Sequence, residues 1–218
     1  MLEKVRERLQ AHRPRRLDNA HPQAAVLLPI VTRPEPTLLF TQRTAHLTQH
    51  AGQVAFPGGK REPEDRDLLA TALRETHEEI ALEPGLVEII GRLSDVISLH
   101  GLRVTPFVGL VEPDLPLKAE PGEIASIFEV PLRHFIDDHR SHTDVIPVDD
   151  QPWYVPSYLF EDRMIWGLSA MMLVELLAVG FESDIALDRK PTQGELRYHP
   201  QRRRQTASRS GQPGKILE

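Results

Sequence analysis

Residues 24–31 read AAVLLPIV, a run of apolar residues without a polar interruption. Such a run is typical of a strand that is buried on both faces, because alternate side chains point to opposite sides of a sheet. Residues 37–43 (TLLFTQR) follow a proline-rich turn and are interpreted as a returning strand. With the helical patterns described next, these strands predict one α+β domain in which helices cover a sheet.

The remaining segments complete this outline. Residues 2–11 have helical spacing, and helices are also expected over 64–82 and, with amphipathic character, over 165–179. Strands are expected over 86–96, 102–111, 144–148 and 153–160. We divide the chain into an N-terminal helix and linker, a main domain and a flexible C-terminal tail rich in arginine, glutamine and serine, over residues 1–22, 23–185 and 186–218.

The chain of 218 residues contains no cysteine, which excludes disulfides, thiolate metal sites and cysteine nucleophiles. Its N-terminus is charged and lacks the apolar segment of a signal peptide. The longest apolar stretch, residues 169–181, is interrupted by Glu175 and is too short to span a bilayer. We therefore expect a cytoplasmic protein without a membrane partner.

The net charge of −6 is distributed unevenly. Residues 1–16 carry +4 and residues 197–218 carry +5, so the body between them carries −15. An acidic body is a poor surface for nucleic acid, and the short basic runs at 13–16 and 202–204 are interpreted as solvated tails. If the substrate is also an anion, a divalent metal ion is the obvious mediator between the two.

The strongest chemical signal lies in residues 58–80. Gly58-Gly59 precedes a helical pattern that contains Glu75, Glu78 and Glu79. At about 100° per residue, these three carboxylates share an arc of roughly 100° on a helix. The cluster could be an inert, solvated surface. It could also bind a hard cation such as Mg²⁺ or Mn²⁺, beside a glycine loop that lets a phosphate approach its backbone.

From Gly59 to Leu82 the segment resembles the signature of the Nudix hydrolase superfamily. Arg74-Glu75 and Glu78-Glu79 stand in the order of that signature, and Leu82 supplies its last aliphatic residue. The resemblance implies the Nudix fold, a mixed β-sheet sandwiched between helices in α/β/α layers. It also makes residues 23–185 the Nudix hydrolase domain and favours the metal site over the solvated surface.

The segment departs from the signature at four points. Asp65 replaces a glutamate, and one additional residue separates it from Arg74. Thr76 fills an aliphatic position, and Ala81 replaces a glycine. None of these changes removes a metal-binding carboxylate. The longer spacing leaves open whether Asp65 pairs with Arg74, as its counterpart does in the family.

The sequence upstream resembles the additional signature of the coenzyme A pyrophosphatase-like subfamily. The matching segments are 39–45 (LFTQRTA) and 50–59 (HAGQVAFPGG), although Thr48 lies where a basic residue is expected. Residues 98–101 (SLHG), which include His100, also resemble this subfamily. The implied substrate-binding residues are Arg43, His50, Gln53, Gly58 and Gly59. Arg43 could grip phosphate or form a surface salt bridge, whereas His50 and Gln53 could instead hold the loop by hydrogen bonds.

The resemblance implies an enzyme that attacks one phosphorus of a diphosphate with water, using Mg²⁺ or Mn²⁺ as cofactor. Glu75 and Glu79 are the expected main metal ligands, and Glu78 is a third ligand or binds a second ion. Arg74 belongs to the catalytic set. The general base is either a glutamate of the signature or Glu123. Coenzyme A or an acyl derivative would yield 4′-phosphopantetheine and adenosine 3′,5′-bisphosphate.

Two other functional hypotheses stay open. The chain could be a Nudix hydrolase of NADH, ADP-ribose or a nucleotide sugar, which keeps the carboxylates but gives the upstream signature no role. It could also be a catalytically inactive nucleotide-binding regulator, although such a module has little need for all three carboxylates. In both enzyme hypotheses the binding partner is a small nucleotide substrate. The sequence leaves open whether the protein forms a homodimer.

Overall fold

Strand β1 (Gln23–Val31) lies inside a mixed eight-stranded sheet, as its apolar sequence predicts. The computed structural model describes residues 1–18, 20–46, 50–98, 101–148 and 151–199. The strand β1 pairs in parallel with β7 (Arg103–Val111) and antiparallel with β2 (Thr37–Arg43) and β4 (Gly58–Lys60). The other strands of this main sheet are β3 (Val54–Ala55), β5 (Val87–Arg92), β6 (Val96–Ile97) and β8 (Ile124–Pro131).

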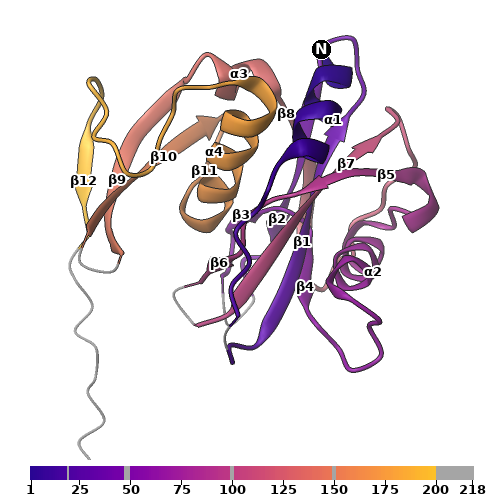
Figure 1. Ribbon diagram of the computed structural model, residues 1–218. Helices are drawn as coiled ribbons and strands as arrows, with labels where there is room; N and C mark the ends of the chain where they lie inside the picture. The colour runs from indigo at the N-terminus through magenta and orange to yellow at the C-terminus, as the bar shows by residue number, and fades with distance from the viewer. Residues whose placement is uncertain (19, 47–49, 99–100, 149–150, 200–218) are drawn as a thin grey trace, which may run out of the picture.

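Helices cover both faces of the main sheet (Figure 1). On one face, Leu27, Val31 and Leu39 pack with Ile80 of α2 (Leu68–Ile80). On the other face, the intervening residues of β1 and β2 pack with α1 (Leu2–Ala11) and α4 (Gly167–Phe181). Burial on both faces explains why β1 has no alternating polar residues. The predicted α+β fold with α/β/α layers is therefore confirmed.

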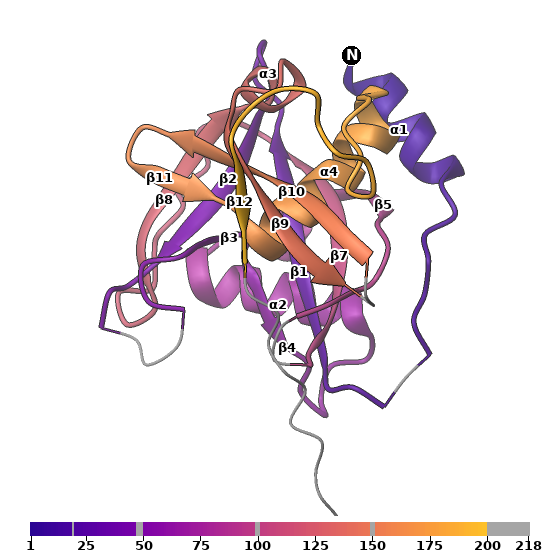
Figure 2. The ribbon, with the colours of Figure 1, turned by 90° about the vertical axis from the view of Figure 1, so that its left-hand side faces the viewer.

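A second sheet lies beyond α4, and Figure 2 looks onto it with α2 on the far side. Its order is β11-β10-β9-β12, where the strands are β9 (Arg140–Val148), β10 (Gln151–Phe160), β11 (Arg163–Ile165) and β12 (Leu196–Tyr198). The short helix α3 (Leu132–Ile136) leads from the main sheet toward it. The sequence predicts β9 and β10 in part, but it does not predict that they form a separate sheet.

The expectation that the last helix is amphipathic is wrong. Helix α4 is buried on nearly all sides because the main sheet and the second sheet enclose it. Its one charged residue, Glu175, accepts hydrogen bonds from the backbone N–H of Ser94 at 3.0 Å and from the Ser94 hydroxyl at 2.7 Å. Glu175 also lies 3.0 Å from the His12 ring. These contacts satisfy a carboxylate that would otherwise be costly to bury.

Element ends differ from the sequence prediction where a cap overrides periodicity. Helix α2 begins at Leu68 rather than near residue 64, because the Asp67 carboxylate accepts the N–H of Ala70 at 2.7 Å and fixes the N-cap. It ends at Ile80, and the C-cap residue Ala81 has φ 55°. This left-handed conformation costs a non-glycine residue about 1 kcal/mol, which explains why the Nudix signature has glycine here.

Within the segment predicted to be a flexible tail, residues 196–198 form β12 and pair in parallel with β9. Main-chain hydrogen bonds order these residues despite their polar composition. Residues 200–218 of that segment lie outside the described residues, as do Thr48 and His100. In the described part of the chain, no helix combines the length and apolarity needed to cross a bilayer.

Candidate active site

The Gly58-Gly59 pair forms the backbone floor of the site. Strand β4 places these glycines opposite Val26 and Ala25 of β1. Gly58 has φ 148°, and a Cβ there would lie 2.3 Å from the Ala25 carbonyl oxygen. A Cβ on Gly59 would lie 2.4 Å from the carboxyl carbon of Glu75. Gly58 therefore requires glycine, because of its positive φ and the nearby Ala25 backbone, whereas Gly59 lets the Glu75 carboxylate lie close to the loop.

Glu79 is the most buried of the three helix carboxylates, with 7 % of its side chain exposed. The Gly58 N–H donates to its Oε2 at 3.1 Å, and Nη1 of Arg43 lies 3.5 Å from its Oε1. Burial raises the pKa of Glu79 to about 7, and the neighbouring Glu75 and Glu123 add to this effect. Glu79 is thus a buried carboxylate whose charge is only partly compensated.

Glu75 lies beside Glu79 and faces the same loop. Burial also raises the pKa of Glu75, against the lowering effect of Arg74, whose Nη2 lies 3.2 Å from its carboxylate. Glu78 behaves differently, because 59 % of its side chain is exposed and Nη1 of Arg74 holds it at 3.0 Å. The sequence places three carboxylates in one arc, but the structure directs only Glu75 and Glu79 toward the glycine loop.

Arg74 organises the outer side of this cluster. It binds Asp65 through Nε at 2.9 Å and Nη2 at 3.0 Å, and it also donates to the Lys60 carbonyl at 3.0 Å. The longer spacing therefore does not prevent the Asp65–Arg74 pair. The Arg74 guanidinium holds the pKa of Asp65 well below its usual range.

Thr71 supports this pair and was missed by the sequence analysis. Its hydroxyl donates to Asp65 Oδ2 at 2.9 Å, and the Glu62 N–H donates to the same oxygen at 2.9 Å. Thr71 is fully buried. No sequence signal identifies it, because its contact depends on a turn that brings residues 62–65 back against the helix.

Arg43 and Glu123 close the site from the sheet side. Nη2 of Arg43 lies 3.4 Å from Glu123, and Nη1 lies 3.5 Å from Glu79, so both contacts are long. Among the described residues, the Arg43 Nε is buried and has no hydrogen-bond partner. The guanidinium is therefore loosely held and can exchange a carboxylate for another anion.

The loop preceding β3 carries His50 and Gln53. Nδ1 of His50 lies 2.8 Å from Oε1 of Gln53, and the Gln53 carbonyl accepts the backbone N–H of Arg43 at 2.9 Å. These contacts correspond to the architectural role considered for both residues. They tie the loop to the strand end that presents Arg43.

The donor set fits a divalent cation by its chemistry. Burial raises the pKa of Glu75 and of Glu79, and the charge of Glu123 adds to both shifts, so the site has an excess of negative charge and offers oxygen donors. Within the described ranges, no three histidine or acidic side chains already form a metal-binding group. Arg74 draws Glu78 away, while Gly58 and Arg43 engage Glu79.

Comparison with known proteins agrees with this geometry. The family model described as NUDIX domain matches residues 21–149. An "Uncharacterized Nudix hydrolase NudL" of Shigella sonnei is 45% identical over 179 residues, which cover 81% of this chain and 93% of the relative. A protein of the same description from Photorhabdus laumondii is 44% identical over 163 residues, which cover 75% of this chain and 87% of the relative.

Among solved structures, a C. elegans Ap4A hydrolase in a binary complex has a TM-score of 0.45 and 19% sequence identity. The match covers 52% of this chain and 83% of that chain.

Proposed function

This chain belongs to the Nudix family, and we propose that it hydrolyses the diphosphate bond of coenzyme A or its acyl derivatives. The Nudix assignment makes it a hydrolase of phosphorus-containing anhydrides. The narrower substrate rests on one observation: residues 50–59, which belong to the coenzyme A-like signature, contact both Arg43 and the carboxylates of α2. Through this loop, Gln53 supports Arg43, and Gly58 donates to Glu79.

In this proposal, Glu75 and Glu79 hold a Mg²⁺ or Mn²⁺ ion, and Glu78 completes the set after leaving Arg74. Nudix hydrolases generally use such ions, which neutralise phosphate charge and acidify bound water when present. Glu79 keeps its position through the Gly58 N–H, and the absence of a Cβ on Gly59 lets the Glu75 carboxylate lie against the loop. The Asp65–Arg74 pair fixes the helix that carries these carboxylates.

We assign the proton transfer to Glu123. Glu79 would be engaged in holding the ion and would then not serve as the base. Glu123 is 54 % exposed and pairs only loosely with Arg43, so it remains free to accept the proton of the attacking water. Water then bonds to one phosphorus, the bridging P–O bond breaks, and the bridging oxygen leaves with the second phosphate.

A substrate panel tests the proposed function. The purified full chain is incubated separately with coenzyme A, NADH and ADP-ribose, with Mg²⁺ or Mn²⁺, and products are identified by mass. We expect 4′-phosphopantetheine and adenosine 3′,5′-bisphosphate from coenzyme A, and their loss with Glu79→Gln. Rapid turnover of NADH or ADP-ribose with intact coenzyme A would overturn the substrate but keep the Nudix chemistry. Absence of any turnover would favour the inactive regulator.

Arg43→Gln is expected to have opposite effects on substrate and metal. Loss of a charged hydrogen bond to phosphate should lower kcat/KM roughly tenfold or more. Removal of the positively charged Arg43 guanidinium from beside Glu79 should tighten Mn²⁺ binding by a few-fold. Calorimetry without substrate measures this change. Arg133→Gln, at a 77 % exposed arginine, is the control. Weaker Mn²⁺ binding in Arg43→Gln would contradict the idea that Arg43 competes with the ion.

A further inference from the structure

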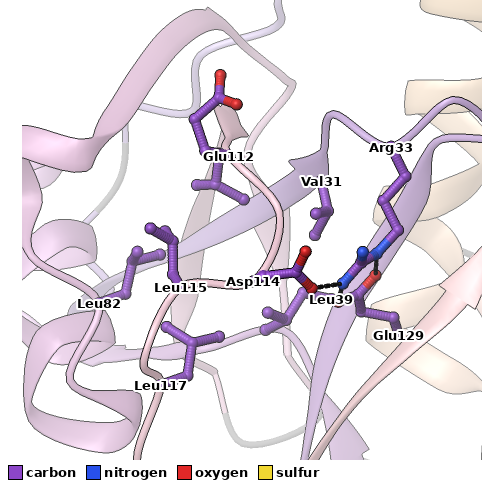
Figure 3. A pocket seen from close by; sticks show the side chains of 10 residues that line it. Val31, Arg33, Leu39, Leu82, Glu112, Asp114, Leu115, Leu117 and Glu129 are labelled. Atoms are coloured by element: carbon purple, nitrogen blue, oxygen red, sulfur yellow. Dashed lines mark hydrogen bonds and ion pairs between the residues drawn. The ribbon is translucent and has the colours of Figure 1, made fainter.

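A cavity of about 220 Å³ lies beyond the carboxylate site, between loop 112–117 and the ends of β1 and β2 (Figure 3). Six of its ten lining residues are aliphatic and come from β1, β2, β7, the residues just after α2 and the loop, namely Val31, Leu39, Val111, Leu82, Leu115 and Leu117. Apolar walls of this kind favour an aliphatic ligand by removing its surface from water.

The polar rim of the cavity carries an excess of negative charge. Arg33 is held by Glu129 at 2.8 and 3.0 Å and by Asp114 at 3.0 Å, and Glu112 adds a further carboxylate. Three carboxylates against one engaged guanidinium disfavour a phosphate or a free fatty acid here. The rim instead suits an uncharged ligand that offers N–H donors.

The cavity and the carboxylate site share one face of the main sheet. Leu39 lines the cavity and Arg43 contacts Glu79, and both belong to β2. Four residues of strand separate them by roughly 13 Å. On the neighbouring strand β8, Ile127 pairs with Thr41, and Glu129 pairs with Leu39. Ile127 and Glu129 are only partly buried. They form a partly exposed strip along this face.

On the basis of the proposed function, we propose that this cavity receives the thiol or short acyl end of the substrate's pantetheine arm. The arm from diphosphate to sulfur has about thirteen bonds, comparable to four extended residues or roughly 14 Å. It is uncharged, and its amide N–H groups can donate to the rim carboxylates. The adenosine 3′,5′-bisphosphate half, being anionic, is excluded from this cavity by the rim.

The cavity volume limits the acyl group. A cavity of about 150 Å³ can hold benzene, so a cavity of about 220 Å³ accepts a short acyl chain but not a long fatty acyl chain. Each buried methylene should improve binding by about fourfold. Because the added contacts are the same in the ground and transition states, the gain belongs in KM rather than kcat.

The test compares coenzyme A with its acetyl, butyryl, hexanoyl and palmitoyl thioesters in the full chain. We expect KM to fall about fourfold per methylene up to the short chains and then to stop falling. Leu115→Trp, which fills the cavity, should abolish this dependence, and Leu117→Phe is a second filling variant in case the first does not fold. Leu159→Trp, at a 45% exposed position of the second sheet, should retain it.

The outcomes separate this inference from the proposed function. A wild-type KM that does not depend on chain length, or a dependence that survives both filling variants, overturns the cavity assignment while coenzyme A hydrolysis stands. If no coenzyme A thioester is cleaved, the proposed function fails. Calorimetry with S-butyryl-pantetheine then tests whether the cavity binds the acylated arm. This ligand should bind the wild type and Leu159→Trp but not the filled variants. Equal binding to the wild type and all variants, or binding to none of them, overturns the cavity assignment.

Discussion

Glu79→Gln should lower kcat/KM by about 10²- to 10³-fold and leave the folded protein at least as stable as the wild type. Glutamine can still accept the Gly58 N–H, which lies 3.1 Å from the carboxylate. It cannot supply the negative charge that a dication requires. Removal of a buried charge, however, relieves the desolvation that raises the pKa of Glu79 to about 7. The substitution should therefore lower kcat/KM without lowering the free energy of unfolding.

The measurement combines steady-state kinetics on the substrate identified by the panel, urea unfolding and Mn²⁺ calorimetry. Glu83→Gln is the matched control, because Glu83 is 64% exposed and its carboxylate lies 3.4 Å from the ring of His77, which is itself exposed. The control should leave all three readouts near those of the wild type. A Glu79→Gln variant that keeps Mn²⁺ affinity and loses stability would show that Glu79 is a structural carboxylate.

Arg74→Ala should reduce the free energy of unfolding by about 3 kcal/mol. The substitution leaves Asp65, whose side chain is 5 % exposed, without its two-point partner and frees the Lys60 carbonyl. Lysine should not restore the loss, because it cannot form the bidentate contact. Urea unfolding at neutral pH measures the change. Arg66→Ala removes an 80% exposed arginine and should change stability by less than about 0.5 kcal/mol.

The same pair predicts an acid dependence of stability. The pKa of Asp65 in the folded protein is lower than its ordinary value of 3.8. Its ionised form therefore contributes stability above pH 3.8, and that contribution is lost as pH falls toward the folded pKa. In Asp65→Asn this slope should be absent. An unchanged acid slope in the variant would assign acid unfolding to other carboxylates.

Local sequence patterns were sufficient for the elements that position the site. The continuous apolar run predicted β1 as a strand with two buried faces, and the helical spacing of residues 64–82 placed Glu75, Glu78 and Glu79 in one arc. The two glycines were recognised as a loop with special backbone geometry, whereas the close approach of Gly59 to Glu75 emerged only in the structure. These features follow from periodicity and backbone sterics, which act between residues near one another in the chain.

The tertiary structure decided how the carboxylates differ. Glu78 and Glu79 are neighbours in sequence, yet one is exposed beside Arg74 and the other is buried between Gly58 and Arg43. The enclosure of α4 between two sheets and the acidic cavity at Arg33 likewise combine distant segments. Burial and pKa depend on which distant residues exclude water from a group. A one-dimensional pattern specifies the chemical groups but not their dielectric surroundings.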